Sequence, residues 1–364
     1  MGGDYMITRP TRMEVSLNNF LYNIEQIKKY TNGVDVMPII KANGYGTHIN
    51  FCTDIINSFN IVGVALVDEG AVLRTNGYKN DIFVLNQPYI DEINNIIEND
   101  IVIGISDKSF LEELIKTNKK VRVHIEIETG MGRTGINPLD IESFISLLKD
   151  NSNIIVEGIY THLSSADYDD EYTKKQLDIF SSSVLKIENL IGKVKYVHCS
   201  ASNGILNYPN SYYNLVRAGI IMYGYESFDK AFEKIDLKPV CTLKSKITFL
   251  KEVEEGTSIG YSRKFITSRK SKIATIPIGY ADGVKRRYNG SIVVKNRKCP
   301  IIGNICMDSL MIDVTDLEDI YVGEDVYIWD NDIITIKEIA LKTDQINYEV
   351  ISTISDRVPR LFIR

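Results

Sequence analysis

The chain has 364 residues, of which 44% are hydrophobic and 25% are charged, and its formal net charge is −6. This length allows two domains with cores of their own. The acidic balance argues against a nucleic-acid partner and against a membrane-surface role, because both need a basic face.

The cysteines and the apolar runs limit the compartment. Five cysteines without CxxC spacing and four scattered histidines argue against a disulfide framework and against a metal site. No apolar run reaches the ~18 residues of a membrane span, and no signal peptide is predicted. We therefore expect a cytoplasmic protein without membrane contact of its own. The opening MGGDYM is interpreted as an added or cut end, so the chain could be the soluble domain of a larger, membrane-anchored protein.

Up to about residue 220, short β-branched runs alternate with amphipathic segments. The predicted strands are 36–40, 61–66, 82–85, 101–105, 121–127, 154–160, 196–199 and 215–216. The predicted helices are 17–30, 68–75, 90–98, 108–116, 139–149 and 171–190. Eight alternating βα units predict a parallel (β/α)8 barrel, and a doubly wound sheet is the alternative.

The pattern changes after Pro239, where closely spaced strands replace the alternation. They are predicted at 243–253, 272–278, 291–294, 301–302, 310–314 and 326–329, with one helix at 336–343. We therefore predict an α/β chain in which residues 1–236 form the barrel and residues 237–364 form a C-terminal β-rich domain.

Lys41 ends the first apolar strand, in the string DVMPIIKANGYGTH. A lysine at the C-terminal lip of a buried strand is partly desolvated, so its neutral amine is favoured and can react with aldehydes. Tyr45 follows in a glycine-flanked turn, where the backbone can approach a ligand closely. The alternative is a lysine that extends its charge into water.

Catalytic residues of (β/α)8 barrels lie at the C-terminal ends of the strands. Five further candidates lie at or after these ends: Arg133, His162, Ser202, Arg217 and the Gly219–Ile220 pair. Phosphate commonly binds after strands seven and eight, where Ser202 and the amides of 219–220 fall. A reactive lysine opposite a phosphate site predicts pyridoxal 5′-phosphate (PLP) as cofactor.

The whole chain resembles the alanine racemase family, the PLP enzymes of fold type III. The resemblance lies in the strings IIKANGYG, IEIETGMGRTG, GIYTHLSSAD, VRAGIIMYG, SIGYSRKF, IGYADG, IGNICMDSL and ISDRVPR, in this order. It implies a PLP barrel, a β domain, a small-molecule amino-acid substrate and a homodimer with shared active sites. The segment HCSASNGILNYP resembles more the serine racemases of vancomycin-resistance clusters (the VanT type).

Racemisation removes a proton from one face of Cα and returns it to the other, so two bases are expected. Lys41 is the first, and the resemblance implies Tyr261, the tyrosine of SIGYS, from the partner subunit as the second. It also implies that Arg217 faces the cofactor's pyridine nitrogen and that His162 supports Arg217. An arginine there stays protonated, so the ring remains a weaker electron sink.

The remaining roles concern the substrate and the phosphate. The resemblance implies that Arg133 and the backbone at Met307 hold the substrate carboxylate, with Arg133 also near the phenolic oxygen of PLP. It further implies that Tyr45 holds the phosphate and that Tyr280 shapes the substrate entry.

Two positions depart from the family pattern as interpreted from these strings. Glu126 stands where alanine racemases commonly carry a carbamylated lysine that orients the neighbouring arginine, and it would supply the anion directly. Asp356, in ISDRVPR, is interpreted as the replacement of a tyrosine that contacts the phosphate and closes the pocket. An aspartate there predicts extra room and an acceptor for a serine hydroxyl, with Asp356 near both cofactor and substrate.

We therefore predict a PLP-dependent racemase of serine and alanine. A housekeeping alanine racemase and a racemase of basic amino acids are the alternatives, the latter because Asp356 could pair with a cation. A barrel-type PLP decarboxylase of ornithine or diaminopimelate shares the architecture, but the Lys41/Tyr261 pattern and the ISDRVPR end argue against it. The string GMGRTG at 130–135 also matches the dinucleotide fingerprint, but it follows the fifth strand and contains an arginine.

Overall fold

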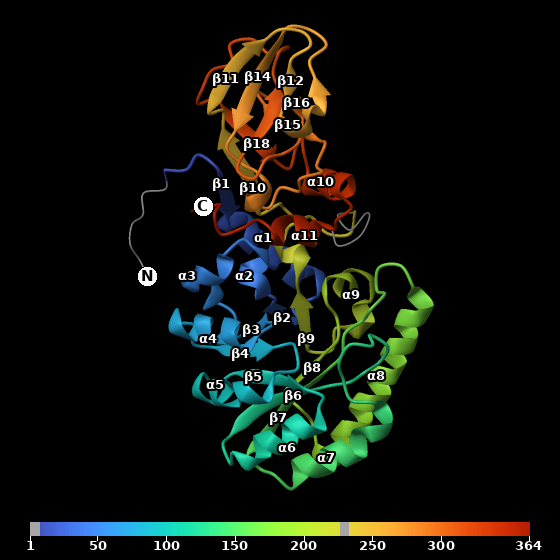
Figure 1. The fold of residues 1–364 in the computed structure, drawn as a ribbon. Coiled ribbons are helices and arrows are strands. Elements are labelled where there is room, and N and C mark those ends of the chain that lie inside the picture. Colours follow the sequence, from blue (N-terminus) through green and yellow to red (C-terminus); the bar gives the residue numbers. More distant parts are fainter. Residues whose placement is uncertain (1–7, 226–232) are drawn as a thin grey trace.

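The computed structural model describes residues 8–225 and 233–364. It has two parts, a parallel βα part and a β-rich part that also contains the first strand (Figure 1). The opening MGGDYM, interpreted above as an added or cut end, lies outside the described residues.

Eight parallel strands form the barrel, and each matches one of the eight predicted runs. They are β2 (Asp35–Pro38), β3 (Ile61–Val64), β4 (Asp81–Val84), β5 (Val102–Ile105), β6 (Val121–Glu126), β7 (Ile154–Tyr160), β8 (Tyr196–His198) and β9 (Leu215–Ala218). The predicted (β/α)8 barrel is confirmed, and the doubly wound alternative is wrong.

The barrel consists of two parallel sheets that are joined to each other by few backbone hydrogen bonds. Strands β3 to β8 form one continuous parallel sheet, and β2 pairs separately with β9. The Ile39–Gly63 bridge joins β2 to β3, and the amide of Arg217 donates to the carbonyl of Ser200 to join β9 to the end of β8. Lys41, which follows β2, and Arg217, which lies in β9, are thus carried by neighbouring strands at one side of the barrel mouth.

Helices surround the strands, and six of them overlap the six predicted amphipathic segments; the three short helices at 41–45, 53–56 and 202–207 were not predicted. They are α1 (Leu17–Tyr30), α2 (Lys41–Tyr45), α3 (Thr53–Ile56), α4 (Val67–Thr75), α5 (Ile93–Glu98), α6 (Lys108–Lys116), α7 (Ile141–Lys149), α8 (Asp170–Ile191) and α9 (Ser202–Asn207). Short 3-10 turns are η1 (Ile49–Phe51), η2 (Ile90–Glu92), η3 (Pro138–Asp140), η4 (Pro209–Ser211) and η5 (Ile220–Tyr223). Ser16 caps α1 by accepting from the amide of Asn19, and the helix buries Phe20, Ile24 and Ile27 at helical spacing.

The second part is a nine-stranded sheet in the order β11-β14-β17-β16-β15-β18-β10-β1-β19. Its strands are β1 (Arg12–Ser16), β10 (Cys241–Lys246), β11 (Phe249–Val253), β14 (Ser271–Ile276), β15 (Ser291–Val294), β16 (Arg297–Ile302), β17 (Leu310–Asp313), β18 (Asp325–Trp329) and β19 (Arg360–Ile363). A hairpin of β12 (Ser258–Ile259) and β13 (Phe265–Ile266), the turns η7 (Tyr261–Arg263) and η8 (Tyr280–Asp282), and the helices α10 (Ile336–Thr343) and α11 (Asn347–Ser352) complete it. The predicted β-rich domain is confirmed.

Two features of this sheet differ from the sequence-based expectation. The single strand expected at 243–253 is two strands, because the chain breaks between β10 and β11 and the two pair with different neighbours. Strand β1 lies near the N-terminus but pairs antiparallel with β10 and parallel with β19. The first strand is therefore part of the C-terminal sheet, while the division near residue 237 stays a prediction.

Within the described residues, no helix is long and apolar enough to span a membrane. The five cysteines are all free.

Candidate active site

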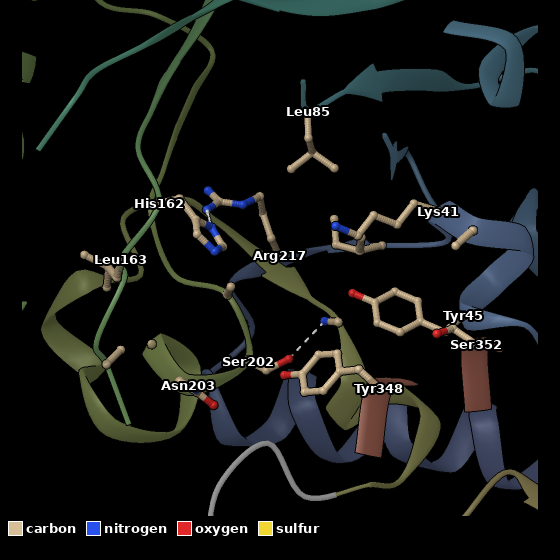
Figure 2. A pocket seen from close by; sticks show the side chains of 16 residues that line it. Lys41, Tyr45, Leu85, His162, Leu163, Ser202, Asn203, Arg217, Tyr348 and Ser352 are labelled. Carbon is tan, nitrogen blue, oxygen red and sulfur yellow. Dashed lines mark hydrogen bonds between the residues drawn. The ribbon is translucent and has the colours of Figure 1, made fainter. Parts of the chain in front are cut away.

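A cavity of about 330 Å³ opens at the C-terminal mouth of the barrel (Figure 2). Its volume lies within the range of small-molecule sites. The lining residues are Ile39, Lys41, Ala42, Tyr45, Leu85, His162, Leu163, Ala166, Ala201, Ser202, Asn203, Gly204, Arg217, Gly219, Tyr348 and Ser352. Six of the predicted site residues are therefore brought together: Lys41, Tyr45, His162, Ser202, Arg217 and Gly219.

Lys41 reaches this cavity from a left-handed turn. Residues 42 to 46, which directly follow Lys41, all have positive φ, between 51° and 79°. Non-glycine residues adopt this conformation at a cost of roughly 1–2 kcal/mol each, and Ala42, Asn43 and Tyr45 are such residues. The turn directs both Lys41 and Tyr45 into the cavity, as Figure 2 shows.

The surroundings of Lys41 favour its neutral amine. Burial and the positive charges of Arg133 and Arg217 lower the pKa of Lys41, and the carboxylate of Glu69 opposes them. The net direction is downward, as predicted from the strand-end position.

Arg217 is fully buried and is held by five acceptors. Its Nη2 donates to the carbonyls of Thr161 and Cys199 at 2.8 and 3.0 Å and to Nδ1 of His162 at 3.1 Å. Its Nη1 donates to Nδ1 and to the carbonyl of His198. Burial, followed by the charges of Arg217, Arg133 and Lys41, lowers the pKa of His162 to about 3, so this ring is neutral and accepts from Arg217. The predicted support of Arg217 by His162 matches this geometry.

Two further histidines extend this network, and the sequence-based reasoning missed both. Nε2 of His198 lies 2.9 Å from Nδ1 of His124. Because Arg217 can only donate, His198 accepts at Nδ1 and donates from Nε2, which places the proton of His124 on its Nε2. Burial lowers the pKa of His124 to about 3 and that of His198 well below its ordinary value. Alternation along β6 and β8 is the sequence signal that could have found them.

The opposite end of the cavity carries hydroxyl groups and a backbone amide. The amide of Gly219 donates to Oγ of Ser202 at 3.2 Å, and a Cβ at Gly219 would lie 3.0 Å from the hydroxyl of Tyr45. Tyr348 on α11 lines the same end, with its ring 6.1 Å from that of Tyr45. Ile220 is buried in η5 and does not line the cavity.

Asp356 does not lie in this cavity. Its side chain is 80% exposed and contacts Nε2 of His48 at 3.1 Å. The reason lies in α11: Tyr348 and Ser352 are four residues apart and share the face that points to the cavity, but the helix ends at Ser352. Asp356 therefore follows a turn and points to solvent. The interpretation of Asp356 as a cofactor and substrate contact has no support in this geometry, and a tyrosine, Tyr348, lines the cavity instead.

Glu126 is buried at the end of β6, and no ion pair joins it to Arg133 within the residues described. Burial raises the pKa of the Glu126 carboxyl, and the hydroxyls of Thr134 and Tyr160 and the charge of Arg133 offset this only in part. Arg133 itself is exposed in the loop after β6 and does not line the cavity. Its charge nevertheless acts on Lys41, His162 and Glu126.

Three predicted residues lie in the second part of the molecule and outside the cavity. Tyr261 is 66% exposed, Met307 52% and Tyr280 41%. Their loops are linked, because the amide of Tyr280 donates to the carbonyl of Cys306 and Nδ2 of Asn304 donates to the carbonyl of Tyr261. We call Tyr261, Tyr280 and Met307 the exposed patch. Within one chain, no residue of the exposed patch lines the cavity that contains Lys41.

The residues of the cavity fit PLP. An amine of lowered pKa stands at one end, and the glycine amide and hydroxyls at the other form a cradle that a Cβ at Gly219 would narrow. Between them lies a guanidinium whose terminal nitrogens are engaged with protein acceptors. Lys41 would bind the aldehyde, while Tyr45, Ser202 and Tyr348 would contact the phosphate.

Comparisons with known proteins agree with this geometry. Residues 15–227 match the family model "Alanine racemase, N-terminal domain", and residues 240–362 match "Alanine racemase, C-terminal domain". The alanine racemase of Clostridium kluyveri is 38% identical over 374 residues, which cover 98% of this chain and 95% of the relative. Alanine racemase 1 of Caldanaerobacter subterraneus subsp. tengcongensis is 35% identical, with 97% and 95% covered.

Solved structures give the same result. The alanine racemase of Clostridium difficile 630 superposes with a TM-score of 0.94 at 33% identity and covers 98% of this chain and 96% of that one. The alanine racemase of Bacillus anthracis with bound L-Ala-P superposes with a TM-score of 0.92 at 32% identity, with 98% and 96% covered. The chain therefore belongs to the alanine racemase family, a family of PLP-dependent amino-acid racemases.

Proposed function

We propose that this chain interconverts the enantiomers of alanine, with PLP as its cofactor and with Lys41 and Tyr261 as the two bases. The observation that carries the proposal is the convergence of Lys41, Arg217 and the hydroxyl and amide cradle on one cavity. The relatives named above are alanine racemases, which supports the same substrate.

Lys41 would hold and return the Cα proton on one face of the substrate. Its lowered pKa raises the fraction of neutral amine at physiological pH, and only the neutral amine accepts a proton. The bound cofactor supplies an electron sink for the charge left on Cα.

Arg217 would limit the strength of that sink. An arginine stays protonated and therefore donates, so it keeps the acceptor it faces unprotonated. Within the described residues, the structure gives acceptors to Nη1 and Nη2 of Arg217 and none to Nε. The Nε–H group is thus the donor left for the pyridine nitrogen.

The second base requires a second copy of the chain. Tyr261 does not line the cavity, and its exposure permits a contact with another subunit. We therefore propose a homodimer in which the exposed patch faces the partner's barrel mouth, with Tyr261 on the second face of Cα, Met307 and Arg133 at the substrate carboxylate and Tyr280 at the entry.

Serine is the second candidate substrate. The segment HCSASNGILNYP, which carries the resemblance to serine racemases, lines the cavity from Ala201 to Gly204. The other reason for serine was the aspartate at position 356, but Asp356 is exposed and does not line the cavity, whereas Tyr348 does. Alanine is therefore the better supported substrate.

The five free cysteines fit the reducing, cytoplasmic compartment that we propose.

A chiral product assay with L-alanine, L-serine, L-lysine and L-arginine tests this function. We expect racemisation of alanine, slower racemisation of serine, and none of the basic amino acids. Borohydride reduction of the PLP-loaded protein, followed by peptide mapping, should place the pyridoxyl label on Lys41. Label on another lysine, or no racemisation of alanine, would contradict the proposal.

A further inference from the structure

The left-handed turn of residues 42–46 needs external support. Ala42, Asn43 and Tyr45 hold backbone conformations that side chains disfavour. Such conformations persist only where the surrounding structure over-determines them. Two charged side chains from distant parts of the chain bind this turn, one at each end.

Glu69 binds the start of the turn. Its Oε1 accepts from the amide of Ala42 at 2.5 Å, and this amide belongs to the peptide that joins Lys41 to Ala42. Its Oε2 accepts from the amides of Ala65 and Leu66 at 2.8 and 3.2 Å. Glu69 is the third residue of α4, where a glutamate ordinarily accepts only from the helix N-cap. Here the carboxylate also joins the start of α4 to the turn of residues 42–46, which we call the lysine turn.

Arg360 binds the end of the turn. Its Nε donates to the carbonyl of Gly46 at 2.8 Å. Its terminal nitrogens donate to the carbonyls of Ile354, Ser355 and Val358, directly after the helix that carries Tyr348. A Cβ at Gly46 would lie 2.5 Å from the carbonyl of Ile351, so the turn and α11 are already in close contact.

We infer that Glu69 and Arg360 are positioning residues that clamp the turn of residues 42–46 and thereby hold Lys41 and Tyr45 in the cavity. The inference rests on the proposed function, because it concerns the placement of the proposed base and of a phosphate contact. Neither side chain lines the cavity, so both act through the backbone that they hold. The Glu69 carboxylate additionally favours the protonated form of Lys41.

The chain offers a matched control for each residue. Glu92 caps η2 in the same way, by accepting from the amide of Tyr89 at 2.7 Å, but it does not reach the lysine turn. Arg74 also donates to four carbonyls, those of Asn99, Tyr78, Asn80 and Asp100, at the other end of α4. Glu92→Gln and Arg74→Lys therefore remove similar contacts away from the cavity.

The experiment compares Glu69→Gln and Arg360→Lys with these two controls in the full chain, measuring PLP affinity, kcat, KM for alanine and thermal stability. We expect both test variants to lose at least about tenfold in kcat, since small misplacements of a reacting group are costly. PLP should bind less tightly, while KM changes by less than about threefold because the carboxylate contacts lie elsewhere. The controls should keep kcat and PLP affinity within about twofold, even where their melting temperature falls.

A second readout does not depend on activity. Trace labelling with acetic anhydride across pH, in the chain without cofactor, reports the pKa of Lys41 against the other lysines. Glu69→Gln removes a nearby anion and should shift the titration of Lys41 to lower pH, whereas Glu92→Gln should not. If Glu69→Gln fails to fold, hydrogen exchange at the Ala42 amide of the wild-type chain tests the role of Glu69 instead. Protection of this amide requires the Glu69 contact.

Kinetics and PLP affinity like those of the controls, an unshifted Lys41 titration, or unprotected exchange at the Ala42 amide would overturn the inference. Failure of the proposed function looks different. In that case the wild-type chain itself would not racemise alanine or would not take the borohydride label at Lys41.

Discussion

The barrel mouth and the exposed patch differ in how far one chain completes them. At the mouth, Arg217 is buried and donates a hydrogen bond to the partly buried His162. In the exposed patch, Tyr261 and Met307 are more than half exposed and do not line the cavity. Both regions carry residues that the family resemblance places in one active site.

The difference teaches which part of the site the fold of one chain organises. Buried donors and acceptors are held by their partners before any ligand binds, and such preorganisation favours catalysis. A proton-transfer group must lie within hydrogen-bond reach of the atom that it serves. The patch meets this condition only if another surface brings it to the mouth, so the comparison can be tested by separating the two regions onto different chains.

The largest expected effect comes from mutating one residue in each region. Lys41→Ala and Tyr261→Phe should each lower kcat by roughly 10²–10⁴-fold, the usual contribution of a general base or acid. Mixing the two inactive variants should restore activity, because each mixed dimer has one site with both bases. At random mixing about half of the dimers are mixed, so the recovery should reach about a quarter of the wild-type rate.

Tyr168→Phe is the control for this experiment, because Tyr168 is an exposed tyrosine of the barrel part that does not line the cavity. Its activity should equal that of the wild type. Demonstrated subunit exchange without any recovery would mean that the exposed patch does not serve a partner's site.

Glu126 sharpens the buried side of the comparison. Glu126→Gln should lower kcat/KM by about one to two orders of magnitude. The reason is that the hydroxyls of Thr134 and Tyr160 would lose their charged acceptor, and a charge-assisted hydrogen bond contributes roughly 1.5–3 kcal/mol. Because burial raises the pKa of Glu126, the wild-type carboxylate ionises at a higher pH than usual. The loss should therefore grow as pH rises, and bicarbonate should have no effect. Identical pH profiles of mutant and wild type would show that the charge of Glu126 is not used.

The histidines predict an acid-labile barrel. All four histidines have lowered pKa values, chiefly through burial. Below pH ~6.5 the histidines bind protons in the unfolded chain but stay neutral in the folded chain. The free energy of unfolding is therefore highest above that pH and falls as the pH drops. Each histidine contributes a slope of up to about 1.4 kcal/mol per pH unit.

Thermal melts at pH 7.5, 6.0 and 5.0 measure this slope. His124→Gln, at the end of the network, should reduce the slope by about one proton. A melting temperature that does not change between pH 7.5 and 5.0 would contradict burial of neutral histidines.

Asp356 provides the smallest expected effect. Asp356→Tyr should change the ratio of serine to alanine efficiency by less than about twofold, because surface substitutions away from a site have small effects and this side chain is 80% exposed. Tyr348→Asn is the contrasting variant, since it opens the cavity itself and should change the ratio further. A tenfold change of the serine-to-alanine ratio in Asp356→Tyr would show that Asp356 does contact the substrate pocket.

Much of the architecture was determined by the sequence alone. All eight barrel strands were predicted, because buried parallel strands form short apolar runs that amphipathic helices separate. Lys41, His162, Ser202 and Arg217 were predicted as site residues for the same reason: strand ends converge at one face of a barrel.

Only the tertiary structure decided the contacts that join distant segments. Strand β1 lies beside β19 although the paired residues, such as Met13 and Arg360, are 347 positions apart, and no local pattern records such a pairing. Tyr348 enters the cavity and Asp356 leaves it because α11 ends between them, which a motif match does not show. The Arg217–His198–His124 network and the contacts of Glu69 and Arg360 with the lysine turn arise in the same way. A hydrogen bond depends on where side chains meet in space, and the sequence specifies that only through the complete fold.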